Sequence, residues 1–501
     1  MRSVFVLLLV IPLLAHTQLQ VAPMFSSNMV LQRNQVLHVW GKAVPGNHVS
    51  VNFAHRFYET VVNGVGEWMV RIPAQQVNTE PQSMEIVSGN EKRVLTNLLV
   101  GDVWICSGQS NMEWPLSKEM HWPAEKEQAG QLLIRFANPS PAGRYVYGVA
   151  YKDSLARRLT KDSFYIWTGW QVCDSQTIAP MSAVAYYFAK SIVSKTGVPV
   201  GVINLSIGGA PAETFISREA MQGSNRFAAK VTPGNWMQND ALPVWARERA
   251  MQNVGGLVNG YGDEWGLNHA YKPAFAFDCG IAPLTAMAIQ GMIWYQGESN
   301  AQQAERVHEY AALMQLMVED YRKRWKRDKM PFYWVQLSSI DTLHYQSQLW
   351  PQFRDEQRKL LAAIRRGGMA VCSDIGTKDN VHPTNKKDVG ERLARWALKD
   401  VYRQAGIVVS GPLPRKASFS KGVLTVSFHY ADGLHPAEGK EITGFSIDGI
   451  TGIPALIRGD HVEIMTSEKP AFVYYGWQPF SKGNLVNGEN LPASTFKITV
   501  P

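Results

Sequence analysis

Apolar and polar residues alternate in short runs at both ends of the chain, with turn residues between the runs. The first part contains VLHVWGKA, HVSVNF and EWMVRIP, separated by turns such as Pro45-Gly46-Asn47 and Asn63-Gly64. A period of two that is broken by Gly, Pro and Asn is typical of antiparallel β-structure. We predict an N-terminal β-sandwich domain over residues 18–99. A C-terminal β-sandwich domain is predicted over residues 406–501, where GVLTVSFHY, HVEIMTS and AFVYYGW repeat the pattern.

Between these ends the period changes. Near-continuous apolar runs alternate with stretches in which apolar residues recur every three or four positions, as in Val307 to Trp325. Buried strands separated by amphipathic helices predict an open parallel sheet with helices on both faces. We therefore predict an α/β domain over residues 100–405, with an insertion at about 211–285. The predicted strands lie at 103–107, 199–207, 289–296, 331–338 and 369–375.

The N-terminus has a different character, because Arg2 is followed by an apolar run from Val4 to Ala15. This run is too short to cross a bilayer of roughly 30 Å, but it has the length of a signal-peptide core. We predict that residues 1–17 are an export signal and that the protein is periplasmic or secreted; a buried first strand is the alternative. No later run reaches the roughly 18 apolar residues of a membrane span.

Composition narrows the classes of function. The 501 residues are 45% hydrophobic and 18% charged, which is typical of a large globular protein with several domains. The net charge of +8 comes from scattered basic residues, so we expect no nucleic-acid partner. The four cysteines are too far apart for a metal site, and Cys106 and Cys372 lie in apolar runs typical of buried free thiols. We expect neither metal nor cofactor, and the sequence does not indicate the oligomeric state.

Polar motifs follow several of the predicted strands, and ligands bind beyond the carboxyl ends of strands in open α/β sheets. Ser110 lies in SGQSNM, where a serine beside backbone N–H groups can act as an acyl-transfer nucleophile. Gly209, in the Gly-Gly pair after the second strand, can direct an N–H at an oxyanion. Gln296, in YQGESN, offers a side-chain amide for the same purpose.

After the fifth strand comes Asp379-Asn380-Val381-His382. The imidazole of His382 can act as a general base, and a carboxylate at Asp379 can hold its tautomer. Each motif also has a structural interpretation, as a turn, a helix cap or a surface histidine. Glu298 is the alternative acid, and Asp374 is a more distant third. The set of four motifs at the ends of separate strands nevertheless predicts a hydrolase that uses Ser110.

Longer blocks of sequence carry a resemblance to a known family. The order of Ser, Gly, amide and Asp-x-x-His resembles the SGNH (GDSL-like) hydrolases, and specific blocks resemble the sialate O-acetylesterases within them. These blocks are MVLQR (29–33), VWGKA (39–43), GDVWICSGQSNMEWPL (101–116), SAVAYYFAK (182–190), IWYQGESNA (293–301), HPTNKKDVGERLA (382–394) and YGWQPFSKGNLVNGENLPASTF (475–496).

The resemblance implies a carbohydrate esterase with a flavodoxin-like SGNH hydrolase domain between two β domains. By position, Ser110 matches the nucleophile, His382 the base and Asp379 the orienting acid. Two departures are visible: Gln296 replaces the Asn that is usual in the superfamily, and FAFDCG (275–280) differs from the pattern that we expect in relatives.

The implied reaction removes O-acetyl groups from sugars through an acetyl-serine intermediate. O-acetylated sialic acids are the first expected substrates, and acetylated xylan or another polysaccharide is the alternative. A different class also stays open, namely a non-catalytic carbohydrate-binding protein in which the β domains bind the sugar.

Overall fold

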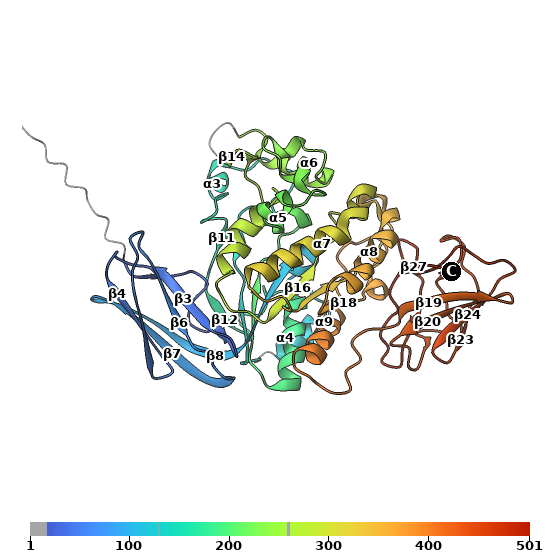
Figure 1. Cartoon of the computed structure of the whole chain (residues 1–501), viewed down its shortest axis with the longest axis horizontal. Coiled ribbons are helices and arrows are strands. Elements are labelled where there is room, and N and C mark those ends of the chain that lie inside the picture. Colours follow the sequence, from blue (N-terminus) through green and yellow to red (C-terminus); the bar gives the residue numbers. More distant parts are fainter. Residues whose placement is uncertain (1–17, 129, 258–260) are drawn as a thin grey trace, which may run out of the picture.

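The computed structural model describes residues 18–128, 130–257 and 261–501, so the predicted export signal lies outside the described residues. Figure 1 shows a β-rich N-terminal part, a central part with helices around a sheet, and a β-rich C-terminal part, arranged in a row. This is a mixed α/β architecture with an additional β region at the C-terminal end. It follows the order of elements that the sequence pattern predicts.

The N-terminal part consists of short antiparallel strands whose side chains alternate between core and surface. In strand β6 (Glu67–Ile72), for example, Trp68, Val70 and Ile72 are buried and the residues between them are exposed. One sheet contains β1 (Gln20–Val21), β3 (Leu37–Lys42) and β6, and the other strands are β2 (Val30–Gln32), β4 (His48–Phe53), β5 (Arg56–Val61), β7 (Asn78–Ser88) and the first half of β8 (Glu91–Gly108).

Strand β8 runs across the boundary that the sequence predicts at residues 99 and 100. Its first half pairs with β7, and its second half pairs with the central strands. Buried Asp102 fixes the crossing point, because Arg33 forms an ion pair with it at 2.9 Å and Gln32 Nε2 donates to it at 2.8 Å. One apolar core continues from Leu19 to Leu398. The N-terminal strands are therefore joined directly to the central sheet.

The central sheet has the strand order β12-β9-β13-β8-β16-β17-β18. The five strands predicted from the sequence are parallel and almost wholly buried, as expected. The sheet as a whole is mixed, because β12 pairs antiparallel with β9 at its edge, and the pattern of alternating helices and strands did not indicate these two strands. The central strands are β9 (Ile134–Ala137), β12 (Trp170–Val172), β13 (Val200–Asn204), β16 (Gly291–Tyr295), β17 (Phe332–Val335) and β18 (Gly367–Ala370).

Four long helices cover the sheet in two pairs, with α4 packed on α9 and α7 packed on α8 (Figure 1). Helix α7 buries the stripe of apolar residues spaced three and four apart that the sequence predicts, including Tyr310, Met314 and Tyr321. The helices are α4 (Ala183–Thr196), α7 (Ala304–Arg324), α8 (Trp350–Ala363) and α9 (Lys387–Asp400).

The remaining elements are short. The insertion at 211–285 contains α5 (Arg218–Gln222), α6 (Val244–Val254), the hairpin of β14 (Gly262–Asp263) and β15 (Gly266–Leu267), and single helical turns. Before it lie α1 (Ser110–Glu113), α2 (Trp122–Glu127), β10 (Ser140–Pro141), α3 (Asp153–Ala156) and β11 (Tyr165–Ile166).

The C-terminal part has its own apolar core, from Ala417 to Val500. Four strands form one antiparallel sheet and three form another, as the alternating pattern predicts. The strands are β19 (Leu413–Ser420), β20 (Val423–His429), β21 (His435–Pro436), β22 (Phe445–Ser446), β23 (Leu456–Arg458), β24 (His461–Met465), β25 (Phe472–Tyr475), β26 (Leu485–Val486) and β27 (Phe496–Thr499).

All four cysteines are buried and free, which confirms the interpretation of Cys106 and Cys372 as core thiols. Across the described residues, no helix combines the length and the apolar content that a bilayer crossing needs.

A buried arginine in α8 attaches the C-terminal part to the central domain. Arg354 is 0% exposed, and it donates to Thr495 Oγ1 at 2.9 Å, to the Gly476 carbonyl at 3.0 Å and to the Pro479 carbonyl at 3.1 Å. Burial lowers the pKa of this guanidinium to about 9, so it stays charged at neutral pH. Nearby, the Ile340 N–H donates to the same Pro479 carbonyl at 3.2 Å. The C-terminal part is thus fixed by polar contacts to α8 and to the loop that follows β17.

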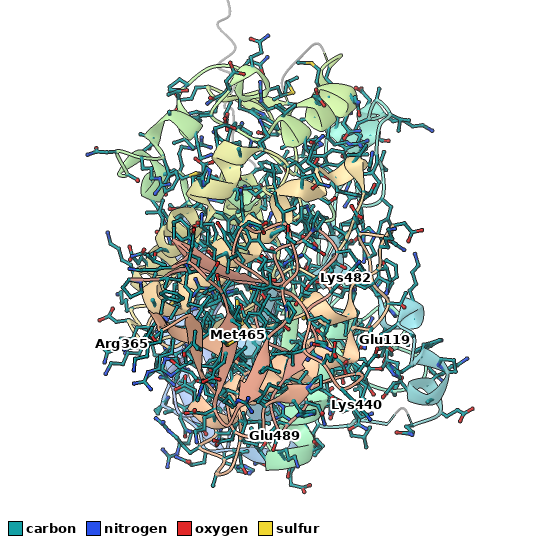
Figure 2. All side chains as sticks on the ribbon, turned by 90° about the vertical axis from the view of Figure 1, so that its right-hand side faces the viewer. Glu119, Arg365, Lys440, Met465, Lys482 and Glu489 are labelled. Carbon is teal, nitrogen blue, oxygen red and sulfur yellow. The ribbon has the colours of Figure 1, made fainter. Side chains whose placement is uncertain are left out.

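We predict that Arg354→Leu destabilises the protein strongly, because several buried carbonyls lose their donor and each unsatisfied group costs about 1–3 kcal/mol. The loss should appear as a lower melting temperature in calorimetry. Arg365→Leu is the matched control, since Arg365 is exposed at the outer edge of the molecule (Figure 2). Equal melting temperatures for the two variants would contradict the anchoring role of Arg354.

Candidate active site

Ser110 and His382, which are 272 positions apart in the chain, meet at the carboxyl edge of the sheet. Ser110 Oγ lies 2.8 Å from His382 Nε2, within hydrogen-bonding distance. Ser110 begins α1 directly after β8, and His382 lies in the loop between β18 and α9. This loop and the turn after β8 both leave the same edge, since the strands are parallel.

The approach of the serine turn depends on Gly108. Its φ is +136°, and a Cβ at this position would lie 2.1 Å from the carbonyl oxygen of Tyr295 in β16. Only glycine accepts both the backbone conformation and this contact. The next residue, Gln109, donates its N–H to the same carbonyl at 2.9 Å. The end of β16 therefore fixes where Ser110 starts its helical turn.

The environment of His382 favours the neutral imidazole. The ring is partly buried and stacks on Trp114, with 5.3 Å between ring centroids. Burial and, secondarily, the positive charges of Lys386 and Lys118 lower the pKa of His382 to about 4. At neutral pH the ring is therefore unprotonated and can accept a proton from Ser110.

None of the three candidate acids contacts the imidazole among the described residues. Asp379 is exposed in the same loop as His382, and no hydrogen bond joins their side chains there. Glu298 is 2% exposed, accepts a hydrogen bond from Asn111 Nδ2 at 2.5 Å, and has a pKa raised by burial. Asp374 forms an ion pair with Arg392 at 2.7 Å, so its charge is already matched.

The Gly208-Gly209 loop after β13 is held by contacts to its carbonyl oxygens. Tyr271 OH donates to the Gly208 carbonyl at 2.6 Å, and Ser299 Oγ donates to the Gly209 carbonyl at 2.8 Å. The φ of Gly209 is +75°, a left-handed conformation that favours glycine. In a trans peptide the N–H points opposite to the carbonyl, so the Gly209 N–H points away from Tyr271. No group in the described residues accepts a hydrogen bond from it.

The Gln296 side chain is fully buried and connects three loops at the carboxyl edge. Its nitrogen lies 2.7 Å from Asn300 Oδ1, 3.2 Å from the Ala210 carbonyl and 3.2 Å from Gln109 Oε1. Its oxygen accepts from Tyr310 OH at 3.0 Å. The Gln296 amide thus lies next to Gln109, the residue before Ser110, and its N–H groups already have acceptors within the protein.

Several residues near the pair were given no part in the reaction by the sequence patterns. Asn111, Trp114 and Lys386 all contact the residues around Ser110 and His382. Glu113, in the same turn as Ser110, forms an ion pair with Arg144 at 2.6 Å beside a small cavity also lined by Tyr147 and Tyr271. Asn111, Glu113, Trp114 and Lys386 lie inside the family blocks quoted above, within four residues of Ser110 or His382. This closeness in the sequence is the signal that could have identified them. Arg144, Tyr147 and Tyr271 lie outside these blocks.

Comparison with known proteins shows that the chain is similar to esterases of sugars. The family model described as carbohydrate esterase, sialic acid-specific acetylesterase, matches residues 279–399. This stretch contains Gln296, Glu298, Asp379 and His382, whereas Ser110 lies before it.

Two mammalian proteins show how far the similarity extends. Human sialate O-acetylesterase is 24% identical over 445 residues, covering 81% of this chain and 76% of the human protein. The mouse sialate O-acetylesterase is 24% identical over 434 residues, covering 80% of this chain and 77% of that protein.

Among solved structures, a carbohydrate acetylesterase from Xanthomonas citri superposes with a TM-score of 0.76 at 27% identity. The superposition covers 96% of this chain and 99% of the bacterial one. The resemblance to sialate O-acetylesterases that the motifs indicate is confirmed by these three findings.

We predict that the imidazole of His382 titrates near pH 4 instead of near the ordinary value of about 6.5, because burial and two lysines disfavour its charged form. The measurement is an NMR pH titration of the histidine ring signals, with His382→Asn assigning the resonance. The unfolded chain takes up this proton at higher pH, so this group's contribution to stability falls as the pH drops from about 6.5 towards 4. A midpoint near 6.5 in the folded protein would contradict the prediction.

Proposed function

We propose, from the premise that this chain is a carboxylic ester hydrolase similar to the sialate O-acetylesterases, that it removes O-acetyl groups from sialic acids. The observation that carries the proposal is the 2.8 Å contact between Ser110 Oγ and His382 Nε2 at the carboxyl edge of the sheet. The substrate class is supported by the names of the relatives and by the family model. Acetylated xylan is the competing substrate within the same enzyme class.

The mechanism that we propose is acyl transfer through the serine. His382 Nε2 accepts the proton of Ser110 as Oγ attacks the acetyl carbonyl, and the tetrahedral intermediate collapses as the protonated imidazole returns its proton to the sugar oxygen. Water then attacks the acetyl-serine by the same proton path and releases acetate. The lowered pKa of His382 keeps the ring neutral before the reaction, so Nε2 is open to the proton of Ser110.

The proposed oxyanion site combines backbone donors with Gln296. Ser110 is the first residue of α1, so its N–H has no partner within the helix. The Gly209 N–H points away from the contact that fixes the Gly208 carbonyl. We propose these two N–H groups as donors to the developing oxyanion. The Gln296 amide, which the sequence offers as a third donor, already has acceptors within the protein, so we propose that it supports the site by ordering Gln109. Each such donor contributes on the order of 10²–10³ in turnover.

For the orienting acid we propose Asp379, which precedes His382 by three residues in the same loop. Its carboxylate is exposed, and no ion pair engages it among the described residues. Glu298 is the alternative, and the contact that it makes with Asn111 supports a structural part instead.

The strand order supports an SGNH-type domain. In chain order the five parallel strands predicted from the sequence are β8, β13, β16, β17 and β18, and their order across the sheet is 2-1-3-4-5, with β9 as a further parallel strand beside β13. Flavodoxin-like sheets have this order, and their ligands bind at its switch point, which here lies between β8 and β16. We propose an SGNH hydrolase domain over residues 100–405 between β domains at 18–99 and 406–501, in a protein exported by residues 1–17.

The proposed function predicts that the purified protein releases acetate from O-acetylated sialic acids and that Ser110→Ala abolishes this release. Without the nucleophile, turnover should fall by at least about a thousandfold. Acetate is measured by a coupled assay on O-acetylated sialic acids and acetylated xylo-oligosaccharides in parallel, with p-nitrophenyl acetate as a substrate that needs no sugar contact.

The outcomes separate the alternatives. Faster release from xylo-oligosaccharides assigns the polysaccharide esterase, and sugar binding without acetate release assigns the non-catalytic protein. An unchanged melting temperature shows that Ser110→Ala keeps its fold, and near-normal turnover in that variant removes Ser110 from the mechanism.

A second prediction concerns the acid. Asp379→Asn should lower kcat on p-nitrophenyl acetate by up to about 10⁴, because a histidine without its carboxylate samples the wrong tautomer. Glu298→Gln is the matched change, and we expect a smaller loss of kcat from it. If Glu298→Gln shows the larger loss, the acid is Glu298 and the proposal for Asp379 fails.

A further inference from the structure

Lys386 is a buried lysine that the proposed mechanism does not use. It lies immediately before α9, four residues after His382, and is 0% exposed. Its ammonium nitrogen Nζ lies 2.5 Å from Asn111 Oδ1. Burial of a lysine costs free energy of folding unless its charge has partners. A fully buried lysine beside Ser110 and His382 therefore indicates a part in the site.

Asn111 joins the two segments that carry the reacting side chains. It follows Ser110 in the chain, and its Nδ2 donates at 3.0 Å to the carbonyl of Val381, the residue before His382. The same nitrogen donates to Glu298 Oε1 at 2.5 Å, and the oxygen accepts from Lys386. Both donor hydrogens and the acceptor of this amide therefore have partners. A side chain held on three sides cannot rotate without breaking the bridge between the serine turn and the histidine loop.

The ammonium group of Lys386 also lies near the aromatic rings beside His382. Nζ is 5.6 Å from the centroid of the Trp114 ring and 5.5 Å from that of the Tyr295 ring. The Trp114 ring in turn stacks on the imidazole of His382. The positive charge of Lys386 is thus fixed beside the Trp114 ring that stacks on the imidazole.

We infer that Asn111 and Lys386 are positioning residues for the reaction: Asn111 sets the separation of Ser110 and His382, and Lys386 holds Asn111 while its charge keeps His382 unprotonated. The inference rests on the proposed function, since it assigns no chemical step of its own. The inference explains why this edge of the sheet buries a cation that takes no part in the proposed proton transfer.

The charged groups around the pair set the direction of the pH effect. Lys386 is faced by Glu298, Glu119 and Cys372, and burial is the largest cause that lowers its pKa, to about 7. His382 is faced by two lysines, Lys386 and Lys118. Below about pH 7 the Lys386 ammonium is charged, so it opposes protonation of His382 in the range where an ordinary imidazole takes up its proton. Loss of the Lys386 charge should raise the pKa of His382 and move the acid limb of activity to higher pH.

The test is the pH profile of kcat and kcat/KM on p-nitrophenyl acetate for Lys386→Met and Lys386→Gln. Methionine removes both the donor and the charge, so we expect kcat to fall roughly 10-fold to 100-fold and the acid limb to rise by about one pH unit. Glutamine keeps a donor for Asn111, so we expect it to regain part of kcat while the acid limb stays raised.

Two controls separate charge from contact. Lys118→Met removes the other lysine charge near His382, and we expect a raised acid limb with kcat retained, because Lys118 makes no contact with Asn111 among the described residues. Lys387→Met changes the neighbouring residue and should alter neither quantity. Asn111→Ala combined with Lys386→Met should cost no more than the larger single loss, because both residues act through one contact.

Wild-type kcat and an unmoved acid limb in Lys386→Met would overturn the inference. If Lys386→Met does not fold, an unmoved acid limb in Lys386→Gln overturns the effect of the Lys386 charge on His382. If the losses of kcat in Asn111→Ala and in the Lys386 variant add in the double variant, the proposal that Lys386 acts by holding Asn111 is wrong. Ser110→Ala in the same assay distinguishes the two failures. If this variant keeps full activity, the proposed function is wrong. If it is inactive and Lys386→Met has wild-type kcat and an unmoved acid limb, only the inference about Lys386 is wrong.

Discussion

The site depends on the contact between Ser110 and His382, and that contact depends on the register of the parallel sheet. Tyr295 pairs with Gly108, so β16 ends where the serine turn begins. The histidine loop leaves β18, which lies three strands away from β8. At about 4.8 Å per strand this is roughly 14 Å, a distance that the loop before α9 spans along the edge. A shift of one residue in the pairing of β8 with β16 would turn the side chains at the end of β8 to the other face and displace the serine turn.

The long strands could be predicted because their signals are local. The motifs at the strand ends also predicted that Ser110 and His382 lie close together, whereas their parts in a reaction stay a prediction. A buried parallel strand is nearly continuous in apolar residues, and the stripe on α7 repeats every three or four positions, so the pattern along the chain was enough. Some strand was expected in the stretch 115–180, but β9 and β12 could not be placed, because each has four residues or fewer and lies among many Trp, Pro and Gly residues. Short edge strands take their stability from neighbours that are distant in the sequence.

Side-chain networks were the other limit of prediction. A spacing of three suggests that Asp379 and His382 are partners, but the loop conformation leaves the carboxylate exposed. Lys386 looks like an ordinary basic residue at a helix terminus. Its burial comes from Trp114, Tyr295 and Asn111, which reach it from β8's turn and β16. The pattern of a sequence shows which face is buried, whereas the partners of a polar group depend on rotamers and on elements far away in the chain.

The contacts between the C-terminal part and the loop after β17 have a mechanical consequence. Ile340 donates to Pro479, the Ser481 N–H donates to Ser339 Oγ at 3.1 Å, and the Asp341 N–H donates to the Lys378 carbonyl at 2.7 Å. Lys378 belongs to the segment that carries His382, so two hydrogen-bonded steps, through the loop after β17, lead from the C-terminal part to that segment. The C-terminal part therefore supports the loop after β17, and a chain shortened to its central domain would leave that loop without the hydrogen bonds with Pro479 and Ser481.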